Sequence, residues 1–401
     1  MIANLDRARD LMESCEVDAL VATTPDNVLY LTGYEGWFER RNSEDMLDPL
    51  SRAIQFPSYA VLTKSDRPAL IVVASFGATA AGLGAIDVQH FGRPVGSPDT
   101  KSAPSAIEVL VQVLKQRGLV DCRIGIELRA PASDRAADLG ARLPLARLDD
   151  CSVLLRYIRA VKTADEIRLM RECAEASQQA AVTALALARP GRDMLDISTA
   201  YRVEVARYDA ELDHFAWGVS DGGIAMQVSS ALKETDLCYV DFGCRRRGYF
   251  SDAGLTLAMR EPRADALAAI DNLVRSLDAG SAALQAGRPA SACQVEMTRA
   301  LHTGSASEHC SASGHGLGVQ VRDLPFVAPR TTERLRDQCV DLPADLPLEA
   351  GMVINLEASV FVAGEYSANV ERSYVVRQHG AELLVSAPPA VLMPGAQGRT
   401  P

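Results

Sequence analysis

Asp241 and Asp252 have the spacing of residues that face each other across a β-hairpin. They lie eleven positions apart in the segment VDFGCRRRGYFSDAG, and a hairpin symmetric about Arg246–Arg247 would place them directly opposite each other. Like charges opposed on one face of a sheet destabilise it, and burying unpaired carboxylates among apolar strand residues costs further free energy. A cation held between the two acids would remove both penalties, so the spacing predicts a metal site.

A second acidic pair repeats this pattern near the C-terminus. Glu357 and Glu371 lie fourteen positions apart in NLEASVFVAGEYSANVERS, and a hairpin centred on Gly364 would oppose them. His315, in the segment GHGLGVQVRDLP, stands between two glycines, which allow close approach of the backbone to a ligand. The alternative, in which the acids point to solvent or pair with nearby arginines, would have to apply to both hairpins. We therefore interpret the four acids and His315 as one metal-binding set.

The chemistry of this set favours catalysis. Four carboxylates and one imidazole are a poor match for a structural Cys-type zinc site and suit Mn, Co, Fe or catalytic Zn. Bridging carboxylates can hold two ions roughly 3.5–4 Å apart with a water between them. The residues alone therefore predict two divalent metal ions and either metal-assisted hydrolysis or Lewis-acid activation of a substrate oxygen.

The composition argues against several classes of partner. The chain has 401 residues, a formal net charge of -11 and 48% hydrophobic residues, which disfavours nucleic acid and anionic membranes and predicts two domains. No apolar stretch approaches the roughly 20 residues of a membrane helix, and the N-terminus lacks the apolar run of a signal peptide. Nine cysteines without a CxxC pair indicate reduced thiols, so we expect a cytoplasmic protein.

Two halves of different character must position the candidate ligands. In residues 1–155, apolar runs such as DALVATT, YAVLTK, ALIVVAS and RIGIEL alternate with helical patterns, which predicts an α/β domain. The charged segment Gly36–Ser58 within it is expected to be a long loop. Residues 156–390 combine helical patterns with paired strands, which predicts an α+β domain. Residues 391–401 are expected to be a disordered tail.

These residues carry a resemblance to metallopeptidase family M24, which includes aminopeptidase P, prolidase, methionine aminopeptidase and creatinase-like relatives. NVLYLTGY resembles the N-terminal domain motif of the family, IRAVKTADEI its domain junction, and KETDLCYVDFG the strand with its first aspartate. The resemblance runs nearly end to end and implies a creatinase-type α/β N-terminal domain and an α+β C-terminal domain of pita-bread fold. It maps the five metal ligands of the family onto Asp241, Asp252, His315, Glu357 and Glu371.

Two departures from the family pattern bear on the reaction. Proline-specific members carry a histidine shortly before the first-aspartate strand, but the corresponding segment GVSDGGIAMQVSSALKETD contains none. They carry another in a His-Glu-x-Pro element, which here reads RDLP, with Arg322 replacing the imidazole and Asp323 the glutamate. Arginine cannot relay protons at working pH, but it can anchor a carboxylate through two hydrogen bonds. We expect Arg322 and Arg372 to bind an anionic group of the substrate; the alternative is that they pair structurally with nearby acids.

Two further histidines and two cysteines near the motifs are not interpreted as site residues. His214 and His309 lie near the motifs but at no family position, so they are expected to be structural or exposed. Cys244 and Cys310 are interpreted as small apolar residues.

The leading hypothesis is a dinuclear metal-dependent hydrolase that cleaves a C–N bond (amide, peptide, or cyclic amide or amidine) of a small carboxylated substrate. Glu357 is expected to accept the proton of the attacking water, as its family equivalent does. Xaa-Pro dipeptides are candidates, and the missing histidines favour specialised substrates like those of the creatinase and ectoine-hydrolase relatives.

Two other hypotheses come from different functional classes. One is a lyase like the dimethylsulfoniopropionate lyase of this fold, with Asp323 as the base; the other is a non-catalytic binding module. The resemblance also implies a homodimer, in which the loop Gly36–Ser58 would complete the pocket of the partner.

Overall fold

The computed structural model describes residues 3–36, 57–94, 96–97, 103–128, 133–218, 223–302 and 309–394. The chain divides into two compact units. Met1–Arg159 with Arg334–Leu342 form the first unit, and Ala160–Glu333 with Pro343–Pro401 form the second. The predicted domain boundary after residue 155 therefore differs from the observed division after Arg159. The predicted loop Gly36–Ser58 lies outside the described residues except at its ends.

The described part of the first unit contains a mixed six-stranded sheet. In spatial order its strands are β4 (Asp87–Phe91), β3 (Ala69–Val73), β2 (Tyr59–Thr63), β1 (Ala19–Ala22), β5 (Arg123–Ile126) and β6 (Arg147–Asp150). Its helices are α1 (Leu5–Ser14), α2 (Pro25–Thr32), η1 (Ala74–Phe76), α4 (Gly77–Ala81), α5 (Ala106–Gln116), α6 (Ser133–Arg142) and α7 (Ser152–Ala160). Strands β1, β2 and β3 are buried along their whole length, as expected for strands covered on both faces. The α/β prediction is confirmed; the more polar β4 and β6 were not among the predicted apolar runs.

A segment from the second half of the sequence packs with the first unit. It contains the hairpin of β14 (Arg334–Arg336) and β15 (Asp341–Pro343). Between these strands, Asp337 Oδ2 accepts hydrogen bonds from the backbone N–H groups of Val153 (2.7 Å) and Leu154 (2.9 Å), which open α7. The first N–H groups of a helix have no acceptor within it, so this carboxylate satisfies donors that α7 leaves open. The prediction that all of residues 156–390 belong to the second domain is corrected for this segment.

The second unit contains a large sheet and four long helices. The described part of the sheet has eleven strands, eight of which follow one path: β13 (Asp323–Val327), β12 (Cys310–Gly316), β16 (Val353–Val362), β17 (Tyr366–Arg377), β11 (Ala253–Ala258), β9 (Leu237–Arg246), β7 (Glu211–Gly218) and β8 (Ile224–Ala225). At its margins lie β10 (Tyr249–Phe250), β18 (Gly380–Leu383) and β19 (Val391–Leu392). The helices are α8 (Ala164–Leu185), α9 (Met194–Arg207), α10 (Ala264–Ala283) and α11 (Ser291–Leu301). In the ranges that the structure describes, no helix has both the length and the apolar character needed to cross a membrane.

The end of the chain is more ordered than the sequence predicts. Strand β19 pairs in parallel with β11, Val391 with Thr256 and Leu392 with Leu257. The prediction of a disordered tail therefore does not hold for Val391 and Leu392, which form this strand and, through Leu392, join the hydrophobic core. Residues 395–401 lie outside the described part of the chain.

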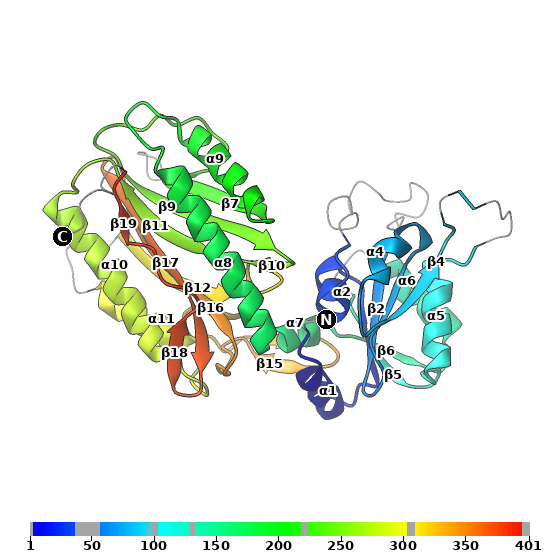
Figure 1. The fold of residues 1–401 in the computed structure, drawn as a ribbon. Coiled ribbons are helices and arrows are strands. Elements are labelled where there is room, and N and C mark those ends of the chain that lie inside the picture. The colour runs from blue at the N-terminus through cyan, green and yellow to red at the C-terminus, as the bar shows by residue number, and fades with distance from the viewer. Residues whose placement is uncertain are drawn as a thin grey trace. The chain divides into compact units, whose positions relative to one another are not determined.

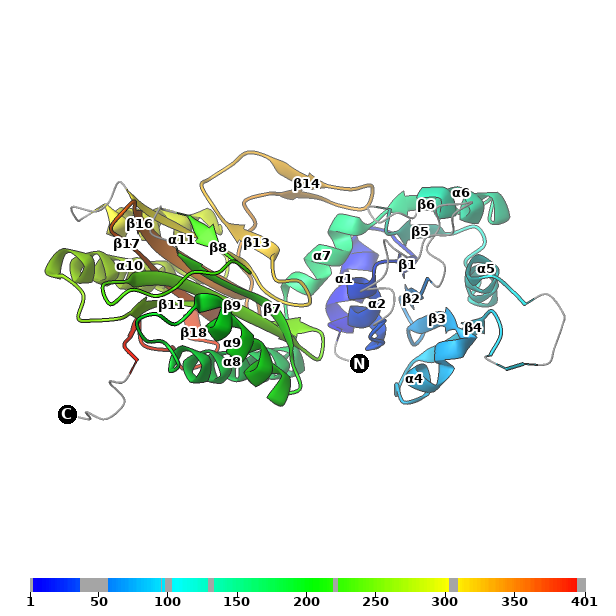
Figure 2. The same cartoon turned by 90° about the horizontal axis from the view of Figure 1, so that it is seen from above.

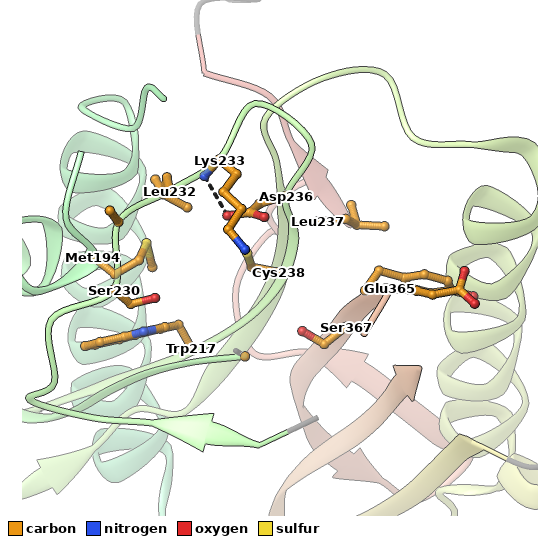
Figure 3. A pocket seen from close by; sticks show the side chains of 13 residues that line it. Met194, Trp217, Ser230, Leu232, Lys233, Asp236, Leu237, Cys238, Glu365 and Ser367 are labelled. Atoms are coloured by element: carbon orange, nitrogen blue, oxygen red, sulfur yellow. Dashed lines mark hydrogen bonds between the residues drawn. The ribbon is translucent and has the colours of Figure 1, made fainter. Parts of the chain in front are cut away.

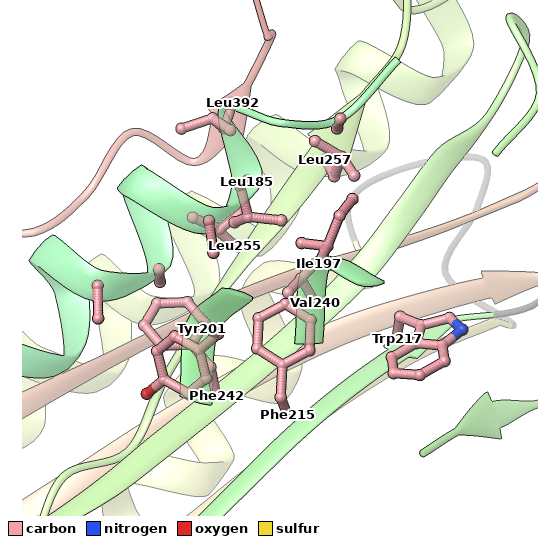
Figure 4. Close-up of a cluster of buried hydrophobic side chains, with 14 of the residues drawn as sticks. Leu185, Ile197, Tyr201, Phe215, Trp217, Val240, Phe242, Leu255, Leu257 and Leu392 are labelled. Atoms are coloured by element: carbon pink, nitrogen blue, oxygen red, sulfur yellow. The ribbon is translucent and has the colours of Figure 1, made fainter. Parts of the chain in front are cut away.

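The helices of the second unit cover the apolar face of its sheet. Helix α8 crosses the strands in Figure 1, and Figure 2 shows α8 and α9 along one side of the sheet. Helix α8 packs against β9, and α10 against β16 and β17. Tyr201 of α9 packs against Phe215 and Phe242, with ring centroids 5.1 and 5.9 Å apart, in the cluster of Figure 4. Successive side chains of a strand point to opposite faces, so the neighbours of Phe242 along β9 point away from this core. Asp241 is one of them.

Candidate metal centre

Strand pairing places three acidic side chains in one row across the sheet. The register pairs Asp241 with Gly254, Gly254 with Glu371, and Glu371 with Glu357. Directly paired residues point to the same face, so all three carboxylates project from the face opposite the helices. A Cβ on Gly254 would lie 2.8 Å from Cγ of Glu371, so the glycine leaves the space that this side chain occupies. The predicted opposition of Glu357 and Glu371 about Gly364 is confirmed.

The hairpin that carries the two aspartates has a different register from the predicted one. It turns at Arg247–Gly248, where φ is 49° and 86°, and not at Arg246–Arg247. Two positive φ values in a two-residue turn match the right-handed twist of the flanking strands. Asp252 is therefore displaced by two positions from Gly254, the partner of Asp241, and the prediction of direct opposition is wrong. A shift of two positions keeps a side chain on the same face, so both aspartates reach the same site.

His315 presents a ring nitrogen to the acids. It is 1% exposed and lies on β12 opposite Asn355 of β16. Its Nδ1 donates to the carbonyl oxygen of Gly316 (3.1 Å), which leaves the lone pair on Nε2. Nε2 is buried, has no hydrogen-bond partner among the described residues, and lies 3.3 Å from Asp252 Oδ2. A buried, unpaired imidazole nitrogen whose other nitrogen is held by a carbonyl is the arrangement of a metal-ligating histidine.

Glu371 is a buried acid whose negative charge has little compensation. It is 2% exposed, and burial together with the negative charges of the other three acids raises its pKa well above the ordinary range. Its Oε1 accepts from Asn369 Nδ2 (2.8 Å) and its Oε2 from Asn355 Nδ2 (3.2 Å). Two neutral amides cannot offset the repulsion of three acids, whereas a bound cation would.

The structure adds His214, which the sequence interpretation left as structural or exposed. On β7 it pairs with Gly243, and its Nε2 lies 2.8 Å from Asp241 Oδ1 and 3.4 Å from Asp252 Oδ1. Its Nδ1 lies 2.8 Å from Asp213 Oδ2. One potential ligand atom from each of His214, Asp241 and Asp252 lies within 4.8 Å of the others. His214 is thus half-buried beside the acids and not exposed, and no local signal in the sequence indicated this.

Contacts among His214, His315 and Asp252 shift the pKa values of these side chains. Burial opposes the charged form of His214, but hydrogen bonds to Asp213, Asp241 and Asp252 outweigh it and raise its pKa well above the ordinary value. Burial would likewise raise the pKa of Asp252, but its contacts with the imidazoles of His214 (3.4 Å) and His315 (3.3 Å) outweigh it and lower that pKa. Asp252 thus carries its negative charge between two imidazoles.

Arg372 does not reach this face of the sheet. It follows Glu371 directly along β17 and pairs with Leu356, so its side chain points to the helix-covered face. Its Nη1 lies 3.6 Å from Asp278 Oδ1 of α10. The structure therefore corrects the expectation that Arg372 binds the substrate, in favour of the structural alternative.

Arg322 and Asp323 have opposite environments at the start of β13. Arg322 is exposed, and its side chain forms no ion pair within the described ranges. Asp323 is fully buried, pairs with Gly316 across β12, and accepts a hydrogen bond from the backbone N–H of Leu324 (3.0 Å). A Cβ on Gly318 would lie 3.5 Å from Lys162 Nζ and 3.6 Å from Asp323 Oδ2, so both groups border the space beside this glycine.

The cysteines near the motifs lie on the helix side. Cys244 is buried, and its Sγ lies 3.7 Å from Cys173 Sγ of α8. Cys310 pairs with Val360 at the far end of β12. His309 is exposed. None of the five candidate ligands is among these contacts.

A pocket at the end of β9 is separate from the acids. It is lined by Met194, Trp217, Lys233, Asp236, Cys238 and Ser367, among others (Figure 3). The backbone N–H of Lys233 donates to Asp236 Oδ2 (2.7 Å), as the dashed line shows. No candidate ligand lines this pocket, so it is not part of the candidate metal centre on the sheet face opposite the helices.

Known proteins with similar sequences and folds identify the family. Residues 168–378 match the model of metallopeptidase family M24, and residues 4–161 match that of the creatinase/prolidase N-terminal domain. The uncharacterized peptidase YqhT of Bacillus subtilis is 22% identical over 97% of this chain and 99% of its own length. Two solved structures share the fold: X-Pro aminopeptidase of Thermotoga maritima (16% identity, TM-score 0.74, 97% of this chain and 99% of that one) and dipeptidase PepE of Mycobacterium ulcerans (19%, 0.73, 97% and 96%). This chain belongs to metallopeptidase family M24, with a creatinase-type N-terminal domain and a C-terminal domain of pita-bread fold.

Proposed function

We propose that this protein is a hydrolase that holds two divalent ions and cleaves a C–N bond of a small carboxylated substrate. The observation that carries the proposal is the row of Asp241, Glu371 and Glu357 on one sheet face, into which the unpaired Nε2 of buried His315 projects. This oxygen-rich set with an imidazole fits Mn, Co, Fe or catalytic Zn. Without a cation, the same set would be a costly cluster of like charges.

The ions would be held by the five family positions: Asp241, Asp252, His315, Glu357 and Glu371. When bound, they would acidify a water molecule and polarise the carbonyl group of the substrate. Glu357 is the proton acceptor in this proposal. It is half-buried, and its Oε1 accepts a hydrogen bond from Ser313 Oγ (2.6 Å), which orients the carboxylate and leaves Oε2 to take a proton from water. The Tyr239 hydroxyl donates to Asp241 Oδ2 (3.0 Å) and orients that acid in the same way.

Arg322 is the proposed anchor for the substrate carboxylate. It is exposed directly before β13, whose pairing partner β12 carries His315. A guanidinium group without an ion pair can bind a carboxylate through two parallel hydrogen bonds. Related proteins bear the names X-Pro aminopeptidase and dipeptidase, which supports a small peptide-like substrate. The two missing peptidase histidines favour a specialised amide or cyclic amide over ordinary Xaa-Pro dipeptides.

The contacts of Asp323 favour hydrolysis over elimination. A lyase of the kind considered above needs Asp323 as a base that reaches the substrate. A carboxylate that is fully buried and accepts a hydrogen bond from a backbone N–H is poorly placed to take a proton from an external molecule. We therefore keep hydrolysis as the proposal.

The test is product analysis with metal-loaded protein. Apo protein would be loaded with Mn²⁺, Co²⁺ or Zn²⁺ and offered Xaa-Pro dipeptides, N-acyl amino acids and lactam carboxylates in heavy-oxygen water. We expect metal-dependent turnover of at least one carboxylated amide, with one solvent oxygen in the acid product. Glu357→Gln should abolish turnover, whereas Glu365→Gln, which alters an exposed acid of the same hairpin, should not.

Three results would contradict the proposal. Elimination products without solvent oxygen would favour the lyase. Failure of the purified protein to bind any transition metal would favour a non-catalytic binding module. Turnover of Xaa-Pro dipeptides at ordinary prolidase rates would remove the reason for a specialised substrate. We also propose a homodimer, which light scattering of the full chain would test.

A further inference from the structure

We propose that His214 is an additional metal ligand, so that each ion of the pair carries one imidazole. This inference rests on the proposed two-ion site but concerns a residue outside the five positions of the family. It begins with the positions of the two histidines on the sheet face. His214 pairs with Gly243 on β9, and His315 pairs with Asn355 on β16. The two imidazoles therefore approach the acids from opposite sides of the cluster, one from β7 and one from β12.

Asp252 lies between the two imidazoles and offers one oxygen to each. Its Oδ1 is 3.4 Å from His214 Nε2, and its Oδ2 is 3.3 Å from His315 Nε2. Two ligand atoms that each lie about 2.1 Å from one ion, at tetrahedral or octahedral angles, are roughly 3.0–3.4 Å apart. Both separations fit this range. If ions are bound, Asp252 would therefore contribute one oxygen beside each histidine.

Asp213 holds His214 in the tautomer that a ligand requires. In the 2.8 Å contact with Asp213 Oδ2, His214 Nδ1 carries a ring proton, so Nε2, which faces Asp241, would become the ligand atom once an ion replaces its proton. A carboxylate behind the non-ligating nitrogen is the common support of a metal-bound histidine. His315 has the equivalent support from the carbonyl oxygen of Gly316.

The backbone around His214 makes room for this orientation. A Cβ on Gly243 would lie 2.5 Å from His214 Cε1, so any other residue there would displace the ring. The pairing of β7 with β9 is irregular between Leu212 and His214, and such bulges often redirect a side chain next to an active site. The register of β12 also shifts directly after His315. Both imidazoles thus stand beside an irregularity in their strand.

The competing interpretation makes His214 a permanent cation. A protonated imidazole would form ion pairs with Asp241 and Asp252 and would take the place of the second ion. The two interpretations differ in stoichiometry. A ligand increases the number of ions bound, whereas a fixed cation decreases it.

The experiment compares metal binding by wild type, His214→Ala, His214→Gln and His302→Ala. His302 is exposed at the end of α11, where its Nδ1 contacts the carbonyl oxygen of Thr298, so its removal is a matched control. Apo proteins would be titrated with Co²⁺, and bound metal would be measured by mass spectrometry. Proton NMR of the Co²⁺ forms would count the paramagnetically shifted ring N–H signals that vanish in D₂O, because each coordinated histidine contributes one.

We expect two equivalents of Co²⁺ and two exchangeable ring signals in wild type and His302→Ala. The two His214 variants should bind one of the two ions at least 10-fold more weakly and show one ring signal. Asp213→Asn should weaken the same ion 10- to 100-fold, as supporting residues of ligating histidines do. Circular dichroism and thermal unfolding of the apo proteins would show that the variants fold.

The outcomes separate the two proposals. If wild type binds two ions and His214→Ala keeps both the affinity and the number of ring signals, His214 is not a ligand, while the proposed hydrolase stands. If wild type binds one ion and His214→Ala binds two, His214 is the fixed cation, and the inference is overturned. If wild type binds no metal, both the inference and the proposed function fail.

Discussion

Two buried glutamates, one in each unit, show how the surroundings of an acid separate structure from chemistry. Glu127 of the first unit is 5% exposed, and its carboxylate accepts hydrogen bonds from Thr23 N (3.0 Å), Thr24 N (2.9 Å) and Asn27 Nδ2 (2.6 Å). Its charge is satisfied by donors. Glu371 of the second unit is buried as deeply, but beside two amides it faces three other acids.

The difference teaches how to interpret a buried carboxylate. Where donors surround the acid, its charge locks a turn or a helix start, and its loss should damage folding. Where other acids surround it, the folded protein is incomplete without a cation, and its loss should damage binding more than folding. The predictions below test this contrast, beginning with the largest expected effect.

Removal of the donor-satisfied acid should cost the most stability. Glu127→Ala leaves the N–H groups of Thr23 and Thr24 and the amide of Asn27 without their acceptor, so we expect a loss of roughly 3–5 kcal/mol of unfolding free energy. Urea unfolding would measure it, with exposed Glu13→Ala as the control. Metal stoichiometry should stay at the wild-type value. A loss of less than about 1 kcal/mol of unfolding free energy would contradict the structural role of Glu127.

Removal of Glu371, which lies among other acids, should weaken metal binding without reducing the stability of the metal-free protein. Glu371→Gln should weaken metal binding at least 100-fold, equivalent to about 2.7 kcal/mol of metal-dependent stabilisation. Its metal-free form should be at least as stable as wild type at pH 7. The pKa of Glu371 is raised in the folded state, so the stability of wild type falls as pH rises above the unfolded value of 4.5. Glutamine does not ionise, so the variant does not lose stability in this way.

Thermal unfolding with and without Co²⁺ would measure both effects of Glu371→Gln. Glu365→Gln, in the turn of the same hairpin, is the matched control. A metal-free Glu371→Gln protein that is several kcal/mol less stable than wild type would show that Glu371 is structural after all.

Glu166 is an intermediate case, and its pH dependence sharpens the comparison. It is 1% exposed, burial raises its pKa to about 7, and it accepts hydrogen bonds from Thr163 N (2.8 Å) and the Tyr249 hydroxyl (3.0 Å). The folded state binds this proton more tightly than the unfolded state, so its contribution to stability is lost as pH rises from about 4.5 to about 7. Between pH 5 and pH 8 we expect wild type to lose about 2–3 kcal/mol relative to Glu166→Gln. Urea unfolding of the apo proteins across this range would test it, with Glu175→Gln on the same helix as control; parallel pH profiles would refute it.

The smallest expected effect is on substrate binding and distinguishes an exposed arginine from one that lies near an acid. Arg322 is exposed and forms no ion pair within the described ranges, whereas Arg372 lies near Asp278 on the helix side. Arg322→Ala should raise KM for a carboxylated substrate about 10-fold, or about 1.4 kcal/mol, with a smaller change in kcat. Arg372→Ala should leave KM unchanged. Steady-state kinetics of both variants would check this, and a KM effect at Arg372 alone would reverse the assignment.

The elements were largely predictable because their patterns are local. The four quoted apolar runs indicated β1, β2, β3 and β5, and helices were expected in both halves of the chain, as α5, α10 and α11 show. The polar β4 and β6 were not predicted because only one residue of each is buried and neither contains an apolar run. The opposite facing of Arg372 and Glu371 was predictable from the two-residue period of a strand, although the arginine was first interpreted as a substrate ligand.

By itself, the sequence determined the candidate metal residues, because hairpin spacing relates two strands within one short segment. It determined the direct pairing of Glu357 with Glu371 for the same reason. Only the tertiary structure decided the two-position shift of Asp252, because the turn selects the backbone conformation at Arg247–Gly248. It alone brought His214 to the acids, because the pairing of β7 with β9 joins strands separated by a long connection, and no local pattern encodes that register.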